Sequence, residues 1–273
     1  MTHNLETKSC FGDLFDKLNP EKKVEIIKPK VVRNETLDLI IEKYKEGLEN
    51  YGLYKAHKLK IKIPENEYLE YYIAKSSAPS EIQSERITEF SLLLGEYENK
   101  KDFESFRGFY LSALINGSKD KDFKIITNYL RKTINFIGYE NAKNIDVNGN
   151  AGDWVGYEMK RGEITIDGNA GWGVGYEMKR GEITVNGNAG NWVGDRMKRG
   201  EITVNGNAGN WVGEEMGGGK ITVNGNAGNL VGWYMKDGEI HLNGDYESLS
   251  DHIKGGNIYH KGKLIVENGR KRI

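Results

Sequence analysis

The apolar residues of the C-terminal half follow a pattern that repeats every 19 residues. Glycines at fixed offsets cut each repeat into short segments, which makes a repeat built from a pair of helices untenable. Each repeat therefore predicts one coil of a β-solenoid, in which successive coils stack as parallel strands. The strand signal is a pair of aliphatic residues at i and i+2, typical of a strand with one buried face. The pairs are Ile164/Ile166, Ile183/Val185, Ile202/Val204, Ile221/Val223 and Ile240/Leu242.

Further columns of identical residues recur with the same period and are predicted to fill the interior of the tube or its corners. They are Ala151, Ala170, Ala189, Ala208 and Ala227; Val155, Val174, Val193, Val212 and Val231; and Met159, Met178, Met197, Met216 and Met235. An asparagine column is expected at a turn, where stacked side chains form hydrogen bonds from coil to coil. It comprises Asn150, Asn169, Asn188, Asn207 and Asn226.

The solenoid is predicted to begin before the first clear repeat. The segment FIGYE at 136–140 aligns with WVGYE at 154–158, and Ile145 and Val147 then match the strand pair of the next coil. Residues 123–127 supply a still earlier strand. At the other end, residues 264–266 predict a last strand and residues 269–273 a frayed tail. Atypical end coils are expected, because a solenoid must protect its open strand edges.

The N-terminal part shows helical periodicity instead. Leu37, Ile40, Ile41, Tyr44, Leu48 and Tyr51 fall on one stripe. Asn34 is the predicted N-cap of this helix and Gly52 its C-terminal boundary. Lysines alternate with apolar residues over 58–63, which predicts a half-buried strand that ends at Pro64. Helices are predicted from Ser80 to about residue 94 and over 102–117.

These patterns predict a mainly β protein in two parts. Residues 1–120 form a mostly helical α+β region, and residues 121–273 form a right-handed parallel β-helix with 19-residue coils and atypical capping coils. All four prolines lie within the first 80 residues, whereas 28 of the 35 glycines lie from Gly149 onward.

Composition narrows the function classes. The net charge of −1 provides no global field for nucleic acid or an anionic membrane. No apolar run is long enough to span a membrane, and the N-terminus lacks the apolar core of a secretory signal, so we expect a cytoplasmic protein. The single cysteine, Cys10, cannot form an internal disulfide. No residue pattern indicates a catalytic, cofactor or metal site.

Two columns of cations recur on the outer face, and we call them the basic columns. Stacked like charges repel, so we expect neutralisation by Glu158 and Glu177, two residues before the lysines, and by Glu163, Glu182 and Glu201, two residues after the arginines. One interpretation is a solvated face on which these acids and bases form ion pairs, and the other is a contact surface for an acidic partner. The basic columns are Lys160, Lys179 and Lys198, and Arg161, Arg180 and Arg199.

The tryptophan column consists of Trp154, Trp192 and Trp211, with Gly173 and Leu230 at the equivalent positions. A buried column would not accept glycine beside tryptophan, so the rings are expected to be partly exposed. They either stack on one another and stiffen the solenoid or form a protein-contact patch. In the second coil the indole is displaced by one position, to Trp172.

The repeat resembles the GXGXG family, the glycine-rich β-helix found in one subunit of formylmethanofuran dehydrogenase and in the C-terminal domain of the glutamate synthase large subunit. The matching blocks are GNAGDWVG at 149–156, MKRG at 159–162 and ITI at 164–166, with their copies, and the resemblance covers about residues 122–262. It implies a scaffold whose catalytic machinery belongs to other subunits or domains.

We therefore expect a non-catalytic scaffold that contacts other protein subunits or a second copy of itself, and neither nucleic acid nor membrane. The alternative is a β-helix enzyme that acts on polysaccharides, which needs an irregular cluster of carboxylates on an exposed groove. A surface-binding solenoid is a third interpretation, because Thr165, Thr184, Thr203 and Thr222 form a flat outward column.

Overall fold

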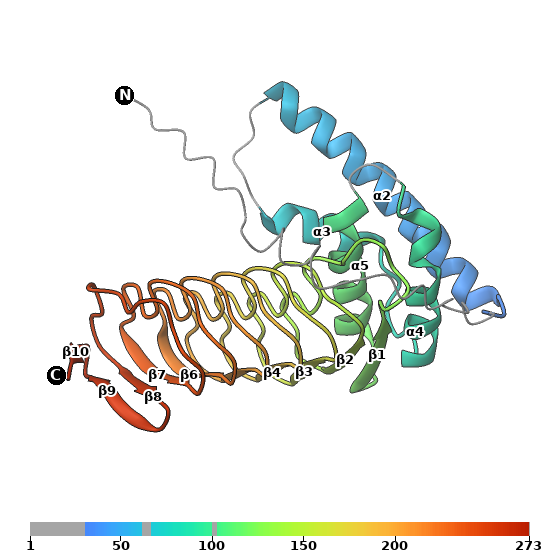
Figure 1. Ribbon diagram of the computed structural model, residues 1–273. Helices are drawn as coiled ribbons and strands as arrows, with labels where there is room; N and C mark the ends of the chain where they lie inside the picture. The colour runs from blue at the N-terminus through green and yellow to red at the C-terminus, as the bar shows by residue number, and fades with distance from the viewer. Residues whose placement is uncertain (1–30, 62–66, 100–102, 273) are drawn as a thin grey trace.

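The computed structural model describes residues 31–61, 67–99 and 103–272 and shows a parallel β-solenoid with a group of helices packed at one end (Figure 1). The predicted β-solenoid is thereby confirmed. Its strands form one sheet in sequence order. They are β1 (Asp122–Ile126), β2 (Asn144–Asn148), β3 (Glu163–Ile166), β4 (Glu182–Val185), β5 (Glu201–Val204), β6 (Gly217–Val223), β7 (Asp237–Leu242), β8 (Asn257–His260), β9 (Lys263–Glu267) and β10 (Arg270–Lys271).

The strands β1 to β8 pair in parallel, and the register of the clear repeats places identical positions side by side, as in Ile164 beside Ile183. The degraded first coil is confirmed as well, because Phe123 pairs with Ile145 and Ile145 with Ile164. The strand predicted over 264–266 is β9. It turns back antiparallel to β8 and closes the far end of the sheet.

The tail prediction was wrong for Arg270 and Lys271. These residues form β10, which pairs antiparallel with β9 after a turn at Asn268 and Gly269, both with positive φ. A charged two-residue edge strand is a poor template for further pairing, so this hairpin protects the end of the solenoid.

The interior of the tube contains the predicted columns. The strand pairs and the alanine, valine and methionine columns are all buried. Gly156 shows why the corners need glycine: its φ is +68°, and a Cβ there would lie 2.4 Å from Cδ1 of Ile183 in the next coil. The asparagine column is also confirmed, since the Oδ1 of each asparagine accepts the backbone N–H one coil later, at 2.7–2.9 Å.

The helical part consists of α2 (Glu35–Ile61), α3 (Glu67–Ser77), α4 (Ser84–Leu93), the short 3₁₀ helix η1 (Leu94–Tyr97) and α5 (Phe103–Gly117). The predicted apolar stripe of α2 faces the core, with Leu37, Ile40 and Tyr44 fully buried. The predicted N-cap is confirmed, because Asn34 Oδ1 accepts the N–H of Leu37 at 2.9 Å. The helix predicted over 102–117 corresponds to α5.

Three expectations for this part were wrong. The strand predicted over 58–63 is helical as far as Ile61, because lysine and leucine are strong helix formers and no breaker precedes Pro64; residues 62 and 63 lie outside the described residues. Helix α2 also continues through Gly52, because a single glycine costs a helix only about 1 kcal/mol. The helix expected from Ser80 begins at Ser84, since Glu81 has a φ of +61° and cannot continue a helix. The described elements before β1 are all helices, in agreement with a mostly helical N-terminal part.

Helix α4 covers the outer edge of β1, where unpaired backbone groups would otherwise invite another strand. The hydroxyl of Thr88 donates to the carbonyl of Lys124 at 2.8 Å, and Ser91 Oγ accepts the N–H of Ile126 at 3.1 Å. The start of α4 is itself capped from a distance, because Asp120 Oδ2 accepts the N–H of Ser84 at 2.7 Å.

Helix α5 lies against the first coil. The Oγ of Ser112 accepts the N–H groups of Gly138 and Tyr139 at 3.0 and 3.1 Å and donates to the carbonyl of Phe136 at 3.0 Å. Buried residues of the helices and of the solenoid form one continuous apolar cluster. The helical part therefore acts as the N-terminal cap of the solenoid (Figure 1).

Candidate partner-contact surface

The basic columns lie at the corner that precedes each strand, and their side chains point to solvent. Lys160, Lys198 and all three arginines are exposed, and Lys179 is half-buried. The backbone holds them in register, since the N–H of Lys198 donates to the carbonyl of Met178 in the preceding coil at 2.8 Å. The predicted stacking of the columns is therefore present.

Glu158 neutralises a lysine of the basic columns, as predicted, but that lysine belongs to the following coil. Lys179 pairs with Glu158 at 2.6 Å and Lys160 with Glu140 at 3.0 Å, so each lysine reaches back to the preceding coil. Both glutamates have a left-handed backbone conformation, with a φ of +51° at Glu140 and +53° at Glu158. A pair whose lysine is open to solvent stabilises the fold by at most about 1 kcal/mol.

In the part of the chain that the structure describes, the arginine column has no such partners. Within the described residues, none of Arg161, Arg180 and Arg199 forms an ion pair, nor does Lys198. The expected partners Glu163, Glu182 and Glu201 point outward from the strands and are exposed. The corner thus presents a row of positive charge that is free to meet an anionic surface.

The tryptophan column is partly exposed, as predicted. Trp192 and Trp211 stack on each other, with ring centroids 5.2 Å apart and planes 11° from parallel. Trp172 is 36% exposed and meets Trp192 edge-on at 5.5 Å. Trp154 stands apart from this stack and packs edge-on against Tyr176 at 5.2 Å.

Gly173 explains the gap in the column. A Cβ at Gly173 would lie 2.2 Å from the indole ring of Trp154, which leans over it from the preceding coil. The φ of this position is left-handed in every clear copy, +62° at Trp154 and Trp192 and +61° at Trp211. A left-handed residue other than glycine costs roughly 1–2 kcal/mol, so three tryptophans here are retained against a local preference for glycine.

A carboxyl pair lies beside the tryptophan column, and the sequence patterns did not point to it. The repeat places Tyr157 and Tyr176 at one position and then Asp195 and Glu214 in the next two coils. Burial, then the neighbouring Glu214, raises the pKa of Asp195 to about 7. Burial also raises the pKa of Glu214, opposed by a hydrogen bond from the indole N–H of Trp192. The available signal was the change from GYEM to GDRM and GEEM within an otherwise copied block.

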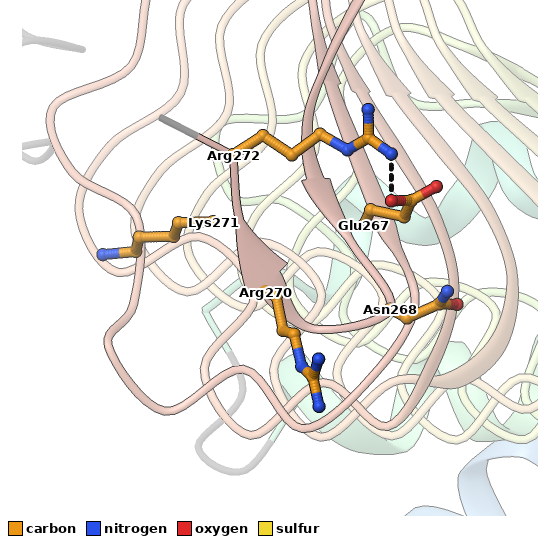
Figure 2. A pocket seen from close by; sticks show the side chains of 5 residues that line it. All are labelled: Glu267, Asn268, Arg270, Lys271 and Arg272. Atoms are coloured by element: carbon orange, nitrogen blue, oxygen red, sulfur yellow. Dashed lines mark hydrogen bonds and ion pairs between the residues drawn. The ribbon is translucent and has the colours of Figure 1, made fainter.

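A concave feature lies at the closing hairpin of the solenoid (Figure 2). A hollow of about 390 Å³ is lined by Glu267, Asn268, Arg270, Lys271 and Arg272. Arg272 pairs with Glu267, and Lys271 pairs with Asp251 at 2.6 Å. Figure 2 shows Arg270 pointing away from the Arg272–Glu267 pair. The hollow is the solvated side of the closing hairpin, where two of three cations already have partners.

Comparison with known protein families and with curated protein sequences finds no match for this chain. Among the described residues, no helix combines the length and the apolar character needed to cross a membrane. The same residues contain no group of three or more histidine, cysteine or carboxylate side chains arranged to hold a metal ion.

Proposed function

We propose that this chain is a non-catalytic scaffold whose outer columns contact other protein subunits or a second copy of the chain. The observation that supports this proposal is the regular exposure of cations and indoles on a stack of hydrogen-bonded coils. Because successive coils are about 4.8 Å apart, such a surface offers a partner evenly spaced contacts along a rigid axis.

The composition of the surface supports the same proposal. Tryptophan and arginine are among the residues most enriched at the positions that dominate binding energy in protein interfaces. The arginine column lacks intramolecular ion partners within the described residues, so contact with an acidic surface would not require an existing pair to break. The tryptophans keep a strained backbone that glycine would relieve, which is typical of positions retained for contact.

The resemblance to the GXGXG family leads to the same role. The β-helix subunit of formylmethanofuran dehydrogenase and the glutamate synthase domain are scaffolds beside catalytic machinery supplied by others. By this analogy the chain is an accessory subunit of a cytoplasmic oxidoreductase complex. The analogy rests on the repeat alone, since residues 1–120 have no counterpart in that resemblance.

A charge-reversal experiment tests the proposal. The chain is tagged in the cells that produce it and purified as wild type, as an Arg161→Glu/Arg180→Glu/Arg199→Glu variant, and as a matched control. The control reverses three exposed lysines elsewhere, Lys121, Lys124 and Lys263, and so changes net charge equally.

We expect the wild type and the control to elute with a stoichiometric partner or as an oligomer of the 30.8 kDa chain. The arginine variant should elute alone, because its contact charge is inverted. A wild type that is strictly monomeric and free of partners in the native extract would contradict the proposal.

One observation favours a second function, a β-helix enzyme acting on polysaccharides. Asp195 and Glu214 form an irregular carboxyl pair beside aromatic rings, and a carboxyl with a pKa near 7 suits general acid catalysis. Against this, Oδ1 of Asp195 is buried and out of reach of a substrate. Release of unsaturated or reducing ends from uronate polymers, lost in Asp195→Asn, would establish the enzyme instead.

A further inference from the structure

The tyrosine position of the repeat changes its chemistry halfway along the solenoid. Tyr139, Tyr157 and Tyr176 pack against one another edge-on, at 5.3 and 4.9 Å. The next two coils place Asp195 and Glu214 at that position. Two acids therefore take up sites that the preceding coils fill with apolar rings.

Asp195 is buried, and one of its carboxyl oxygens receives no hydrogen bond from the described residues. The residue is 8% exposed, and its Oδ1 is buried with no hydrogen-bond partner among the described residues. The nearest cation is Arg196, whose Nε is 4.0 Å from Oδ1, beyond hydrogen-bonding range. A buried carboxylate oxygen without a donor is strongly disfavoured, and a bound proton removes that penalty.

The charges around Asp195 also favour its protonated form. Three acids act on Asp195, namely Glu177, Glu214 and Glu215, against the single cation Arg196. The guanidinium of Arg196 is already engaged, because it donates to the hydroxyl of Tyr176 and pairs with Glu215 at 3.6 Å. Adjacent coils are about 4.8 Å apart, so Asp195 and Glu214 repel each other when both are ionised.

We infer that Asp195 and Glu214 form a proton-binding site that holds one proton near neutral pH and releases it to solvent in mildly alkaline solution. The inference does not rest on the proposed contact function, because it concerns these two carboxyl groups alone. The raised pKa of Asp195, about 7, agrees with the geometry. The two groups titrate as a pair, so the proton belongs to the site rather than to one residue.

The site is connected to the tryptophan column. The indole N–H of Trp192 donates to Glu214, and Trp192 in turn stacks on Trp211. Loss of the proton places two negative charges beside this contact, so the environment of Trp192 changes with the ionisation of the pair. The tryptophan column thus acquires a response to pH around neutrality.

Carboxyl ¹³C chemical shifts measured against pH test the inference directly. In the wild type the Asp195 signal should titrate with a midpoint near 7. In Glu214→Gln the midpoint should fall by roughly one pH unit, because the like charge is gone while burial remains. The matched control Glu201→Gln changes an exposed acid on β5 and should leave the midpoint unchanged.

Tryptophan fluorescence gives a second readout that needs no assignment. The wild type should show an intensity step with the same midpoint, and Asp195→Asn should abolish it. An Asp195 midpoint below about 5 in the folded wild type would overturn the inference, since ordinary aspartate titrates near 3.9. An unchanged midpoint in Glu214→Gln would overturn the shared site.

Discussion

Gly108→Ala probes the seating of α5 on the first coil. A Cβ at Gly108 would lie 1.6 Å from the backbone oxygen of Asn135, where real contacts do not fall below 3.0 Å. Helix and coil must separate by more than an ångström, which would also stretch the three hydrogen bonds of Ser112 on the same helix. Overpacking against backbone costs roughly 1–3 kcal/mol or more, and loss of the serine contacts adds to this.

Helix propensity acts in the opposite direction, since alanine is favoured over glycine by about 1 kcal/mol in a helix. We therefore expect a net loss of about 3 kcal/mol or more in the free energy of unfolding. Gly52→Ala in α2 is the matched control, because a Cβ there meets no described atom within 4 Å. It should gain about 0.5–1 kcal/mol.

Urea unfolding followed by circular dichroism measures both variants. The two glycines should shift the midpoint in opposite directions, Gly108→Ala downward and Gly52→Ala slightly upward. A Gly108→Ala protein as stable as the wild type would refute the capping role of this helix, since α5 could not then lie against Asn135.

Three further predictions concern single side chains. Ser112→Ala should lower the free energy of unfolding by about 3 kcal/mol, because two buried N–H groups lose their acceptor. The control Ser76→Ala, at an exposed serine, should change it by less than about 0.5 kcal/mol. Equal urea midpoints for the two variants would contradict this prediction. Asn207→Ala should cost about 1 kcal/mol in thermal melting, since its Oδ1 accepts the N–H of Asn226 at 2.8 Å; an unchanged melt would show that the ladder contributes nothing. Because folding raises the pKa of Asp195, its protonated form stabilises the folded state. This contribution is fully present below the ordinary pKa near 3.8 and is lost as the pH rises through about 7. Wild type should therefore lose about 2 kcal/mol relative to Asp195→Asn between pH 5 and pH 8, measured by urea unfolding at each pH, and parallel pH profiles would refute the shift.

Much of the solenoid could be predicted because its information is local and repeated. An i, i+2 pair such as Ile183 and Val185 predicts a buried strand in any one copy, and the period of the copies fixes the register. The capped start of α2 at Asn34 was likewise readable from adjacent residues. These features depend on backbone preferences and on the side chains of near neighbours.

The strand expected over 58–63 was a misjudged local preference, whereas the features that the sequence did not reveal depend on residues distant in it. Lys179 pairs with Glu158 across coils, and the sequence alone does not say toward which coil its side chain leans. The cap of α4 comes from Asp120, far along the chain. The Asp195–Glu214 pair becomes unusual only when the enclosure of Asp195 is known.

Site-specific crosslinking tests the central claim, that the outer columns contact a protein partner. A photoreactive residue is placed at Arg180, at Trp211 and, as a control on the sheet face, at Thr184, in the cells that produce the chain. We predict crosslinks to one defined protein, another copy or another subunit, from the first two positions and not from Thr184. Equal yields from all three positions, or none from Arg180 and Trp211, would contradict the claim.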